Sequence, residues 1–257
     1  MAPVKVGSRT DVGRVRALNE DAFLVGRRAW LVADGMGGHA AGDIASALVV
    51  RRMRELDEAD ALDPATVIAT ITRANEDVLA YGTDHPESWG LGSTVSGVCE
   101  VHVGGAPHWA VFNVGDSRVY RFWRGELSRA TVDHSETEEM VLAGQITEQQ
   151  ARTHHRRNII TRSIGTPGVP QVDLWVLPQS GGERFLICSD GLTSELDDEQ
   201  IASVLREEPD PANAVDSLVE GALQAGARDN VTVLVVDVEG HGSDGADENT
   251  NPRERQS

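Results

Sequence analysis

A short apolar run that stops at an acidic residue followed by glycine is the feature that most constrains this chain. Residues 29–33 are continuously apolar, and Asp34 and Gly35 follow them directly. A run of this length predicts a buried strand that ends at the turn. Because Gly35 has no side chain, the backbone can turn sharply there, and its carbonyl can approach whatever Asp34 holds. Taken alone, the pattern fits equally well an acidic turn after a core strand.

Three further segments repeat this design, which favours a shared role for their acidic residues. Each places an aspartate at the end of an apolar run: Asp190 after residues 185–189, Asp116 after residues 111–114, and Asp229 before residues 231–236. Near the N-terminus, Glu20 and Asp21 add a carboxylate pair, with Arg16 upstream. Carboxylate oxygens, completed by water, suit Mg²⁺ or Mn²⁺, whereas Zn²⁺ prefers histidine or thiolate ligands.

The charge balance argues against several classes of partner. The 257 residues carry a formal net charge of −18, which disfavours nucleic acid and anionic membranes because both bind basic faces. Whatever attracts a phosphate must then be local, as metal ions and Arg16 would be. Cys99 and Cys188 lie inside apolar runs, which indicates core packing rather than a disulfide or a nucleophile.

The order of the expected elements predicts an α+β fold. Two helices in succession, over residues 41–53 and 63–80, are not a crossover between parallel strands. Helices are also expected over residues 198–206 and 211–225, and strands over residues 5–12, 22–25, 29–33, 92–103, 108–114, 118–123, 172–177, 185–189 and 230–238. Two strand groups, each with a helix pair, predict a double β-sheet sandwich with helices outside.

We expect residues 1–239 to form a single domain. Residues 133–165 interrupt the strands with polar, helix-forming sequence, in which Thr147 and Gln150 stand at capping-box spacing. Residues 240–257 have too little apolar content to bury and are expected to be disordered. No apolar run approaches the length of a bilayer span, and no signal-like segment opens the chain. These features predict a soluble, cytoplasmic protein with no membrane insertion.

With these motifs in order over residues 4–238, the chain resembles the metal-dependent protein phosphatases of type 2C in their bacterial form. The resemblance implies the four-layer αββα sandwich and makes residues 133–165 a mobile flap beside the active site. The family pattern for the flap is His-Pro-x-Arg-Asn followed by Thr-Arg-x-x-Gly. Residues 154–158 read HHRRN and residues 161–165 read TRSIG, so His155 replaces the proline. This departure leaves the conformation and substrate preference of the flap open.

The resemblance also implies a role for each strand-end aspartate. Asp34 would bridge two Mn²⁺ or Mg²⁺ ions and act as a catalytic residue, and Gly35 would offer its carbonyl to one of the ions. Asp190 and Asp229 would bind the other ion. Asp116, together with Asp190, resembles the pair that holds a third, weaker metal in bacterial members.

Other residues would support the metals and bind the substrate. Glu20 and Asp21 would order metal-bound waters, and Arg16 would act as a catalytic residue that grips the substrate phosphate with its fork of donors. Eukaryotic members often have a histidine after the Asp-Gly pair, proposed as a general acid, where this chain has Met36. Protonation of the leaving group would then fall to a metal-bound water, because His39 is expected to cap or pack.

Several of these residues have simpler alternative roles. Asp116 has a neighbouring cation, Arg118, with which it would pair without any metal. Arg16 would otherwise be a solvated charge, and Glu20 an ordinary surface acid.

The reaction that follows is hydrolysis of phosphoserine and phosphothreonine in proteins by a hydroxide that two metals activate, without a covalent phosphoenzyme. The partners would be phosphorylated proteins, including bacterial serine/threonine kinases, and the protein would act as a monomer. A silent phosphoprotein-binding module and a phosphatase of a regulator of sigma-factor control are the alternatives. Rival phosphatase chemistries lack their residues, because neither Cys99 nor Cys188 has an arginine five residues later, and Asp-x-Asp, Asp-x-His and Gly-Asn-His motifs are missing.

Overall fold

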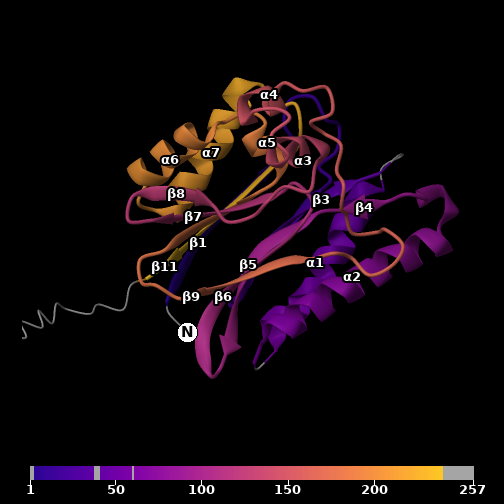
Figure 1. Cartoon of the computed structure of the whole chain (residues 1–257), viewed down its shortest axis with the longest axis horizontal. Coiled ribbons are helices and arrows are strands. Elements are labelled where there is room, and N and C mark those ends of the chain that lie inside the picture. Colours follow the sequence, from indigo (N-terminus) through magenta and orange to yellow (C-terminus); the bar gives the residue numbers. More distant parts are fainter. Residues whose placement is uncertain (1–2, 38–40, 60, 240–257) are drawn as a thin grey trace, which may run out of the picture.

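Two antiparallel β-sheets face each other in the middle of the molecule, and helices cover their outer faces (Figure 1). The computed structural model describes residues 3–37, 41–59 and 61–239. The strand order is β1-β11-β10-β7-β8 in one sheet and β2-β3-β5-β6-β9 in the other, with β4 pairing β3. This arrangement confirms the α+β double-sheet sandwich flanked by helix pairs.

The first sheet carries the C-terminal helix pair. Its strands are β1 (Val4–Asp11), β7 (Arg118–Trp123), β8 (Glu126–Arg129), β10 (Arg184–Cys188) and β11 (Val231–Val238). Its helices are the short α5 (Asp190–Thr193), α6 (Asp198–Glu207) and α7 (Pro211–Ala225). The apolar stripe of α7 packs on β1 and β11 and forms one core between helices and sheet.

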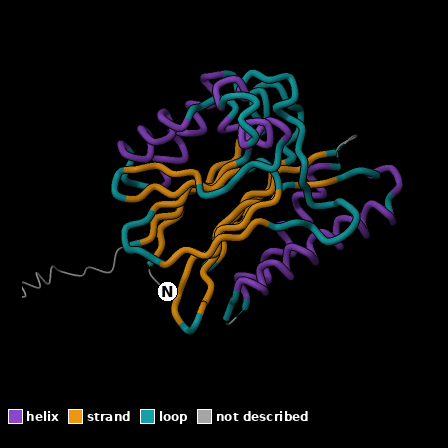
Figure 2. Tube along the Cα trace, viewed as in Figure 1, coloured by secondary structure: helices purple, strands orange, loops and turns teal. Residues whose placement is uncertain are grey.

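The second sheet carries the N-terminal helix pair, which lies on the opposite side of the sandwich (Figure 2). Its strands are β2 (Asp21–Val25), β3 (Ala29–Met36), β4 (Gly92–Ser93), β5 (Val95–Val103), β6 (Ala106–Val114) and β9 (Asp173–Pro178). Its helices are α1 (Gly42–Glu58), α2 (Pro64–Asp84) and the 3₁₀ turn η1 (Pro86–Ser88). Among the described residues, no helix is long and apolar enough to cross a membrane.

Strand β3 shows why these strands read as continuous apolar runs. Trp30 and Val32 face the core between the two sheets, whereas Leu31 and Ala33 face the core under α1 and α2. Successive side chains of a strand point to opposite faces, so a strand in the middle of four layers is apolar on both. The run of residues 29–33 is therefore a sandwich-core strand, as its sequence predicts.

Most element boundaries agree with the sequence-based expectations, and the differences lie near the aspartates. Asp63 caps α2 by accepting a hydrogen bond from the backbone of Thr66 at 2.7 Å, which confirms the expected start of that helix. Strand β3 continues through Asp34 and Gly35 to Met36, further than its apolar run. The expected strand over residues 92–103 is two strands, β4 and β5, and both β8 and α5 are additional elements.

The polar segment between β8 and β9 contains two short helices, α3 (Glu136–Leu142) and α4 (Glu148–Arg152). The expected capping box is present, because Thr147 Oγ1 accepts from the backbone of Gln150 and Gln150 Oε1 accepts from the backbone of Thr147. Both helices lie near α5 in Figure 1 and share a cavity lining with it.

A buried glutamate joins the two sheets at their far end. The side chain of Glu183 is fully inaccessible, and it accepts hydrogen bonds from Trp109 Nε1 at 2.9 Å and from Arg121 Nε at 2.7 Å. Trp109 belongs to β6 in one sheet, and Arg121 belongs to β7 in the other. Glu183 therefore fixes how the sheets stack as well as neutralising a partly buried arginine.

We expect replacement of Glu183 by alanine to lower the free energy of unfolding by roughly 3 kcal/mol, because it leaves the arginine and the indole N–H without their acceptor. Glu183→Gln keeps an acceptor and is expected to cost about 1 kcal/mol. Chemical denaturation followed by tryptophan fluorescence measures both values. Equal losses in the two variants would contradict the assigned role of the carboxylate.

Candidate metal centre

The strand registers bring all the candidate aspartates to one end of the sandwich. Asp21 lies directly opposite Asp34 in the β2–β3 ladder. The end of β10 pairs with the starting portions of β7 and β11. Asp190, Asp116 and Asp229, which flank those strands, therefore meet at the same end of the first sheet.

Asp21 lies at the seam between the two sheets. Its Oδ2 accepts hydrogen bonds from Ser189 Oγ at 2.8 Å and from Thr232 Oγ1 at 2.6 Å, both from the opposite sheet. Its Oδ1 is buried without a hydrogen-bond partner among the described residues. A buried carboxylate oxygen normally has a partner, so this atom is suited to an ordered water beside a cation.

The carboxylates of the site raise one another's pKa values. Burial, followed by the charges of the surrounding aspartates, raises the pKa of Asp34 well above its usual range. The same causes raise the pKa of Asp190 to about 6. Burial raises the pKa of Asp21 to about 7, although the hydrogen bonds from two hydroxyl groups partly oppose this rise. Asp116, which is 8% exposed, also has a pKa well above its usual range through burial and the charge of Asp190. A divalent cation would relieve this repulsion, so the donor set fits one.

The carboxylates are near enough to interact electrostatically without being gathered into a finished ligand cage. In the part of the chain that the structure describes, no three histidine, cysteine, aspartate or glutamate side chains form a ready-made metal cluster. One of the four aspartates is held elsewhere, because Asp229 Oδ2 accepts a hydrogen bond from Arg16 Nη2 at 2.7 Å. The structure thus pairs Asp229, which the sequence analysis assigns to a metal ion, with Arg16, which it assigns to the substrate phosphate.

Gly35 is required by close packing. A Cβ atom at this position would lie 2.0 Å from the carbonyl oxygen of Gly42, at the start of α1. The backbone N–H of Gly35 donates to the carbonyl of Glu20 at 3.1 Å. The Asp34-Gly35 segment is therefore held tightly between the β1–β2 loop and α1, as a backbone ligand requires.

Asn230 is a site residue that the sequence reasoning missed. Its Oδ1 accepts from the backbone of Glu20 at 2.8 Å, and its Nδ2 donates to the carbonyls of Val12 and Leu18 at 2.9 Å. These bonds anchor the loop that carries Arg16 and Glu20 beside Asp229. The sequence signal that could have identified Asn230 is its position directly after Asp229 and before an apolar run.

Arg118, the arginine next to Asp116 in sequence, forms its ion pair with another aspartate. Arg118 makes its ion pair with Asp133, at 2.6 Å between Nη2 and Oδ2, and it also bonds Tyr120. Arg118 thus gives its hydrogen bonds to Asp133 and Tyr120 and acts on Asp116 through its charge, which lowers the pKa of Asp116 against the effect of burial. His39, which was expected to cap or pack, lies outside the described residues.

The turn before Asp116 is linked to the strand that carries Asp34 through Thr94, which lies between β4 and β5. Gly115 has a φ of +116°, and a Cβ there would lie 2.5 Å from Thr94 Cγ2, so only glycine fits. Thr94 Oγ1 accepts from the backbone of Asp34 at 2.9 Å and shares a hydrogen bond with Ser117 Oγ at 2.8 Å. Thr94 and Ser117, which the sequence reasoning also missed, fix the spacing of the two aspartates.

A cavity of about 560 Å³ leads from the carboxylates toward α3 and α4. Its lining includes Asp116 and Asp190 on one side, and Arg152 and Arg157 from the segment over residues 133–165 on the other. The cavity therefore lies next to the candidate metal centre.

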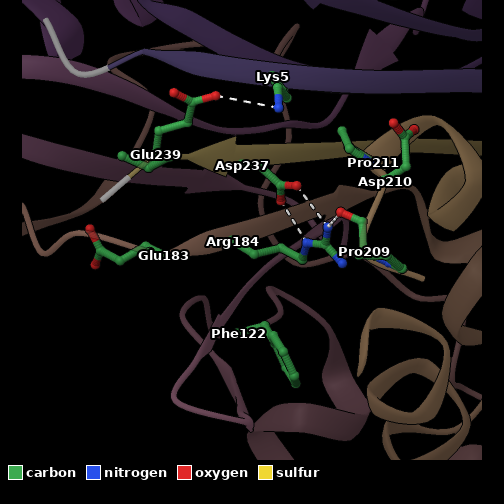
Figure 3. Close-up of a pocket in the computed structure, with 11 residues that line it drawn as sticks. Lys5, Phe122, Glu183, Arg184, Pro209, Asp210, Pro211, Asp237 and Glu239 are labelled. Carbon is green, nitrogen blue, oxygen red and sulfur yellow. Dashed lines mark hydrogen bonds and ion pairs between the residues drawn. The ribbon is translucent and has the colours of Figure 1, made fainter. Parts of the chain in front are cut away.

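A second cavity, of about 530 Å³, lies at the opposite ends of β10 and β11, around Arg184 (Figure 3). All five donors of Arg184 are in use, with Asp237 and with the carbonyls of Leu205, Glu208 and Pro209. This arginine ties the α6–α7 connection to the sheet and has no donor left for a ligand.

Comparisons with known proteins agree with this geometry. The family model described as Protein phosphatase 2C matches residues 13–225. The chain belongs to the protein phosphatase 2C family. Serine/threonine protein phosphatase PstP of Mycobacterium tuberculosis is 36% identical over 239 residues, which are 91% of this chain and 45% of that protein. Serine/threonine phosphatase stp of Listeria welshimeri is 34% identical over 240 residues, which are 89% of this chain and 94% of that protein.

A solved structure of a relative that contains metal ions has the same fold as this chain. The catalytic domain of serine/threonine protein phosphatase PstP in complex with two manganese ions matches with a TM-score of 0.81 and 34% identity, covering 92% of this chain and 98% of that one. The chain spans about half the length of the first curated relatives it matches, at 45%. Membership of the phosphatase 2C family and its fold are thereby established.

The raised pKa values predict how the stability of the metal-free protein depends on pH. An acid with a higher pKa in the folded chain than its ordinary 3.8 binds more protons when folded. The contribution of these aspartates to the stability in EDTA should therefore fall as the pH rises from about 4 toward about 7, by several kcal/mol in all. Denaturation curves at several pH values measure the fall, and added Mn²⁺ at neutral pH is expected to reverse it.

The matched control for this prediction is Asp190→Asn, which removes one of the repelling charges. Its stability should change less with pH than that of the unmodified chain over the same range. A variant with the same pH dependence as the parent would show that the aspartates do not repel one another as described.

Proposed function

We propose that this chain is a Mn²⁺- or Mg²⁺-dependent protein phosphatase that hydrolyses phosphoserine and phosphothreonine. The observation that carries the proposal is the convergence of four aspartates from both sheets, Asp34, Asp116, Asp190 and Asp229, at one end of the sandwich. Burial and mutual repulsion raise the pKa values of the first three. Membership of the phosphatase 2C family gives this acidic cluster its chemical setting. The complete acid set does not favour a silent phosphoprotein-binding module.

The proposed ligands divide between the two sheets. Asp34 and the Gly35 carbonyl, from one sheet, and Asp190 and Asp229, beside the other, would together hold two ions. Asp116 joins Asp190 in a third, weaker site. When bound, the ions lower the pKa of coordinated water and offset negative charge on the phosphate oxygens.

The remaining groups of the site order water and bind phosphate. The unpartnered Oδ1 of Asp21 suits a hydrogen bond from an ordered water, and Glu20 lies beside it in the loop that Asn230 anchors. Arg16 is about half exposed at the edge of the site, so its guanidinium can leave Asp229 and form two parallel hydrogen bonds to a phosphate. A metal that occupies Asp229 releases Arg16 for this task.

The physiological setting follows from the chemistry of the site. Phosphorylated proteins are its substrates, among them serine/threonine kinases and the proteins that they modify. The protein acts in the cytoplasm as a monomer. A strongly negative chain draws these substrates through the local cations rather than through its overall field.

Hydrolysis of a phosphothreonine peptide tests the function. We expect no release of phosphate in EDTA and full recovery when Mn²⁺ or Mg²⁺ is added in excess. Asp190→Ala is expected to lose several orders of magnitude in rate, roughly 10²–10⁴-fold, because it removes a ligand of the proposed two-metal site. Circular dichroism and a denaturation curve confirm that the variant is folded. Activity in EDTA, or a folded Asp190→Ala variant that keeps its rate, would exclude the proposed centre.

Arg16→Ala separates phosphate binding from metal binding. Loss of the guanidinium should raise the KM for the phosphopeptide about tenfold or more, since charge-assisted hydrogen bonds of this kind contribute roughly 1.5–3 kcal/mol. The Mn²⁺ concentration that half-activates the enzyme should stay the same or fall, because Asp229 loses a competing partner. Arg14→Ala, in the same loop, is the matched control. Unchanged kinetics in Arg16→Ala would make this arginine an ordinary solvated charge.

A further inference from the structure

His134 contacts the turn that presents Asp116. Its ring is 4% exposed, and Nδ1 accepts a hydrogen bond from the backbone N–H of Gly115 at 3.1 Å. The backbone N–H of His134 donates in return to the carbonyl of Gly115 at 2.9 Å. Gly115 directly precedes Asp116, so these two bonds hold the peptide units on either side of Gly115, the second of which leads into Asp116.

The hydrogen bonds determine the tautomer of His134. A backbone N–H can only donate, so Nδ1 is the unprotonated nitrogen and the ring proton resides on Nε2. Nε2 lies 3.1 Å from Asp173 Oδ2, to which it donates. Arg162 Nη1 also lies 3.1 Å from Nε2, and because both nitrogens carry protons, both donate to the Asp173 carboxylate rather than to each other. Burial lowers the pKa of His134, in keeping with a neutral ring. Arg162 Nη1 donates to the other oxygen of Asp173 at 2.9 Å, which fixes the orientation of that carboxylate.

The same histidine holds both ends of the segment over residues 133–165. Its carbonyl accepts from the backbone of Thr161 at 2.8 Å, and the next residue, Ser135, forms a β-bridge with Ile160. Arg162 belongs to the returning end of this segment. A displacement of the segment would therefore be transmitted through His134 to Gly115.

The other side of the turn is attached to the core. The carbonyl of Gly115 also accepts from Asn113 Nδ2 at 3.1 Å, and the Oδ1 of Asn113 accepts from Ser96. Gly115 is thus held from the core by Asn113 and Thr94 and from the other side by His134 alone among the described side chains. His134 joins this turn to the returning end of the segment, where Thr161 and Arg162 lie, and to strand β9 through Asp173.

We propose that His134, oriented by Asp173 and Arg162, is a positioning residue that places Asp116 and couples it to the segment over residues 133–165. The role rests on the proposed function, in which Asp116 is a ligand of the weaker metal. His134 touches neither metal nor substrate in this scheme. His134 sets the affinity of the centre for its weaker metal. The position of the segment over residues 133–165 affects that affinity through His134.

Two replacements of His134 separate its hydrogen bonds from its volume. His134→Phe keeps a ring but loses both nitrogens, so Gly115 has no acceptor. His134→Asn keeps an oxygen in the place of Nδ1 and restores that acceptor. Asn75→Ala is the matched control, because Asn75 is buried and bonds the backbone of Gly165 at 2.7 Å without contacting Gly115. Its hydrogen bonds, to residues 165, 166 and 168, lie outside the contact between His134 and Gly115, so the variant controls for the general loss of a buried polar side chain.

Mn²⁺ titrations of EDTA-stripped protein by isothermal titration calorimetry, with phosphopeptide hydrolysis in parallel, test the role. His134→Phe should weaken the weakest Mn²⁺-binding step about tenfold or more, as loss of a group that orients a ligand typically does. His134→Asn should recover most of that loss, Asp173→Asn should weaken the same step, and Asn75→Ala should leave it unchanged.

The proposal is overturned if folded His134→Phe binds Mn²⁺ as the unmodified chain does, or if Asn75→Ala weakens binding equally. Should His134→Phe fail to fold, Asp173→Asn decides by the same criterion. Calorimetry keeps this result separate from the proposed function, because an unmodified chain that binds Mn²⁺ without hydrolysing the peptide would refute the phosphatase activity alone.

Discussion

The packing of the two sheets against each other is the constraint on which the site depends. Trp30 and Trp109 meet edge to face with ring centroids 6.1 Å apart, and Trp109 and Phe185 meet at 5.7 Å. Full burial of side chains of this size contributes roughly 2–3 kcal/mol each. Asp34 comes from one sheet and Asp190 from the other, so they meet only when this apolar layer forms. The layer therefore offsets the repulsion that their meeting creates.

The polar groups that hold the aspartates are neutral, which preserves the charge of the site. Ser189 and Thr232 hold Asp21 through hydroxyl groups, and Thr94 holds the backbone of Asp34. A buried arginine in their place would satisfy the carboxylates but would also cancel the negative charge that attracts divalent cations. Two arginines also lie near the aspartates. Arg118 is neutralised by its ion pair with Asp133, and Arg16 lies at the exposed edge, where a substrate or a metal can displace it.

Features that depend on neighbouring residues could be predicted from the sequence, and those that depend on distant ones could not. Asp34 and Asp190 were recognisable because each ends its own apolar run, and Asp63 because a proline follows it. His134 was not, since its partners Gly115 and Asp173 lie 19 and 39 residues away and nothing local distinguishes its ring. Strand β8 was missed because its half-polar sequence forms an edge strand only through pairing with β7.

The acidity of the chain determines how the site can bind the proposed phosphorylated substrate. A phosphate monoester that approaches a protein with a net charge of −18 meets a repulsive field, and the aspartates of the site strengthen it. Cations reverse the sign of this field only where the aspartates converge. The aspartates would repel the substrate when they hold no metal and would bind it through the metal ions when they hold them. Substrate recognition and catalysis would therefore both require metal binding. A separate basic surface for phosphate binding would break this link by admitting substrate to the metal-free protein.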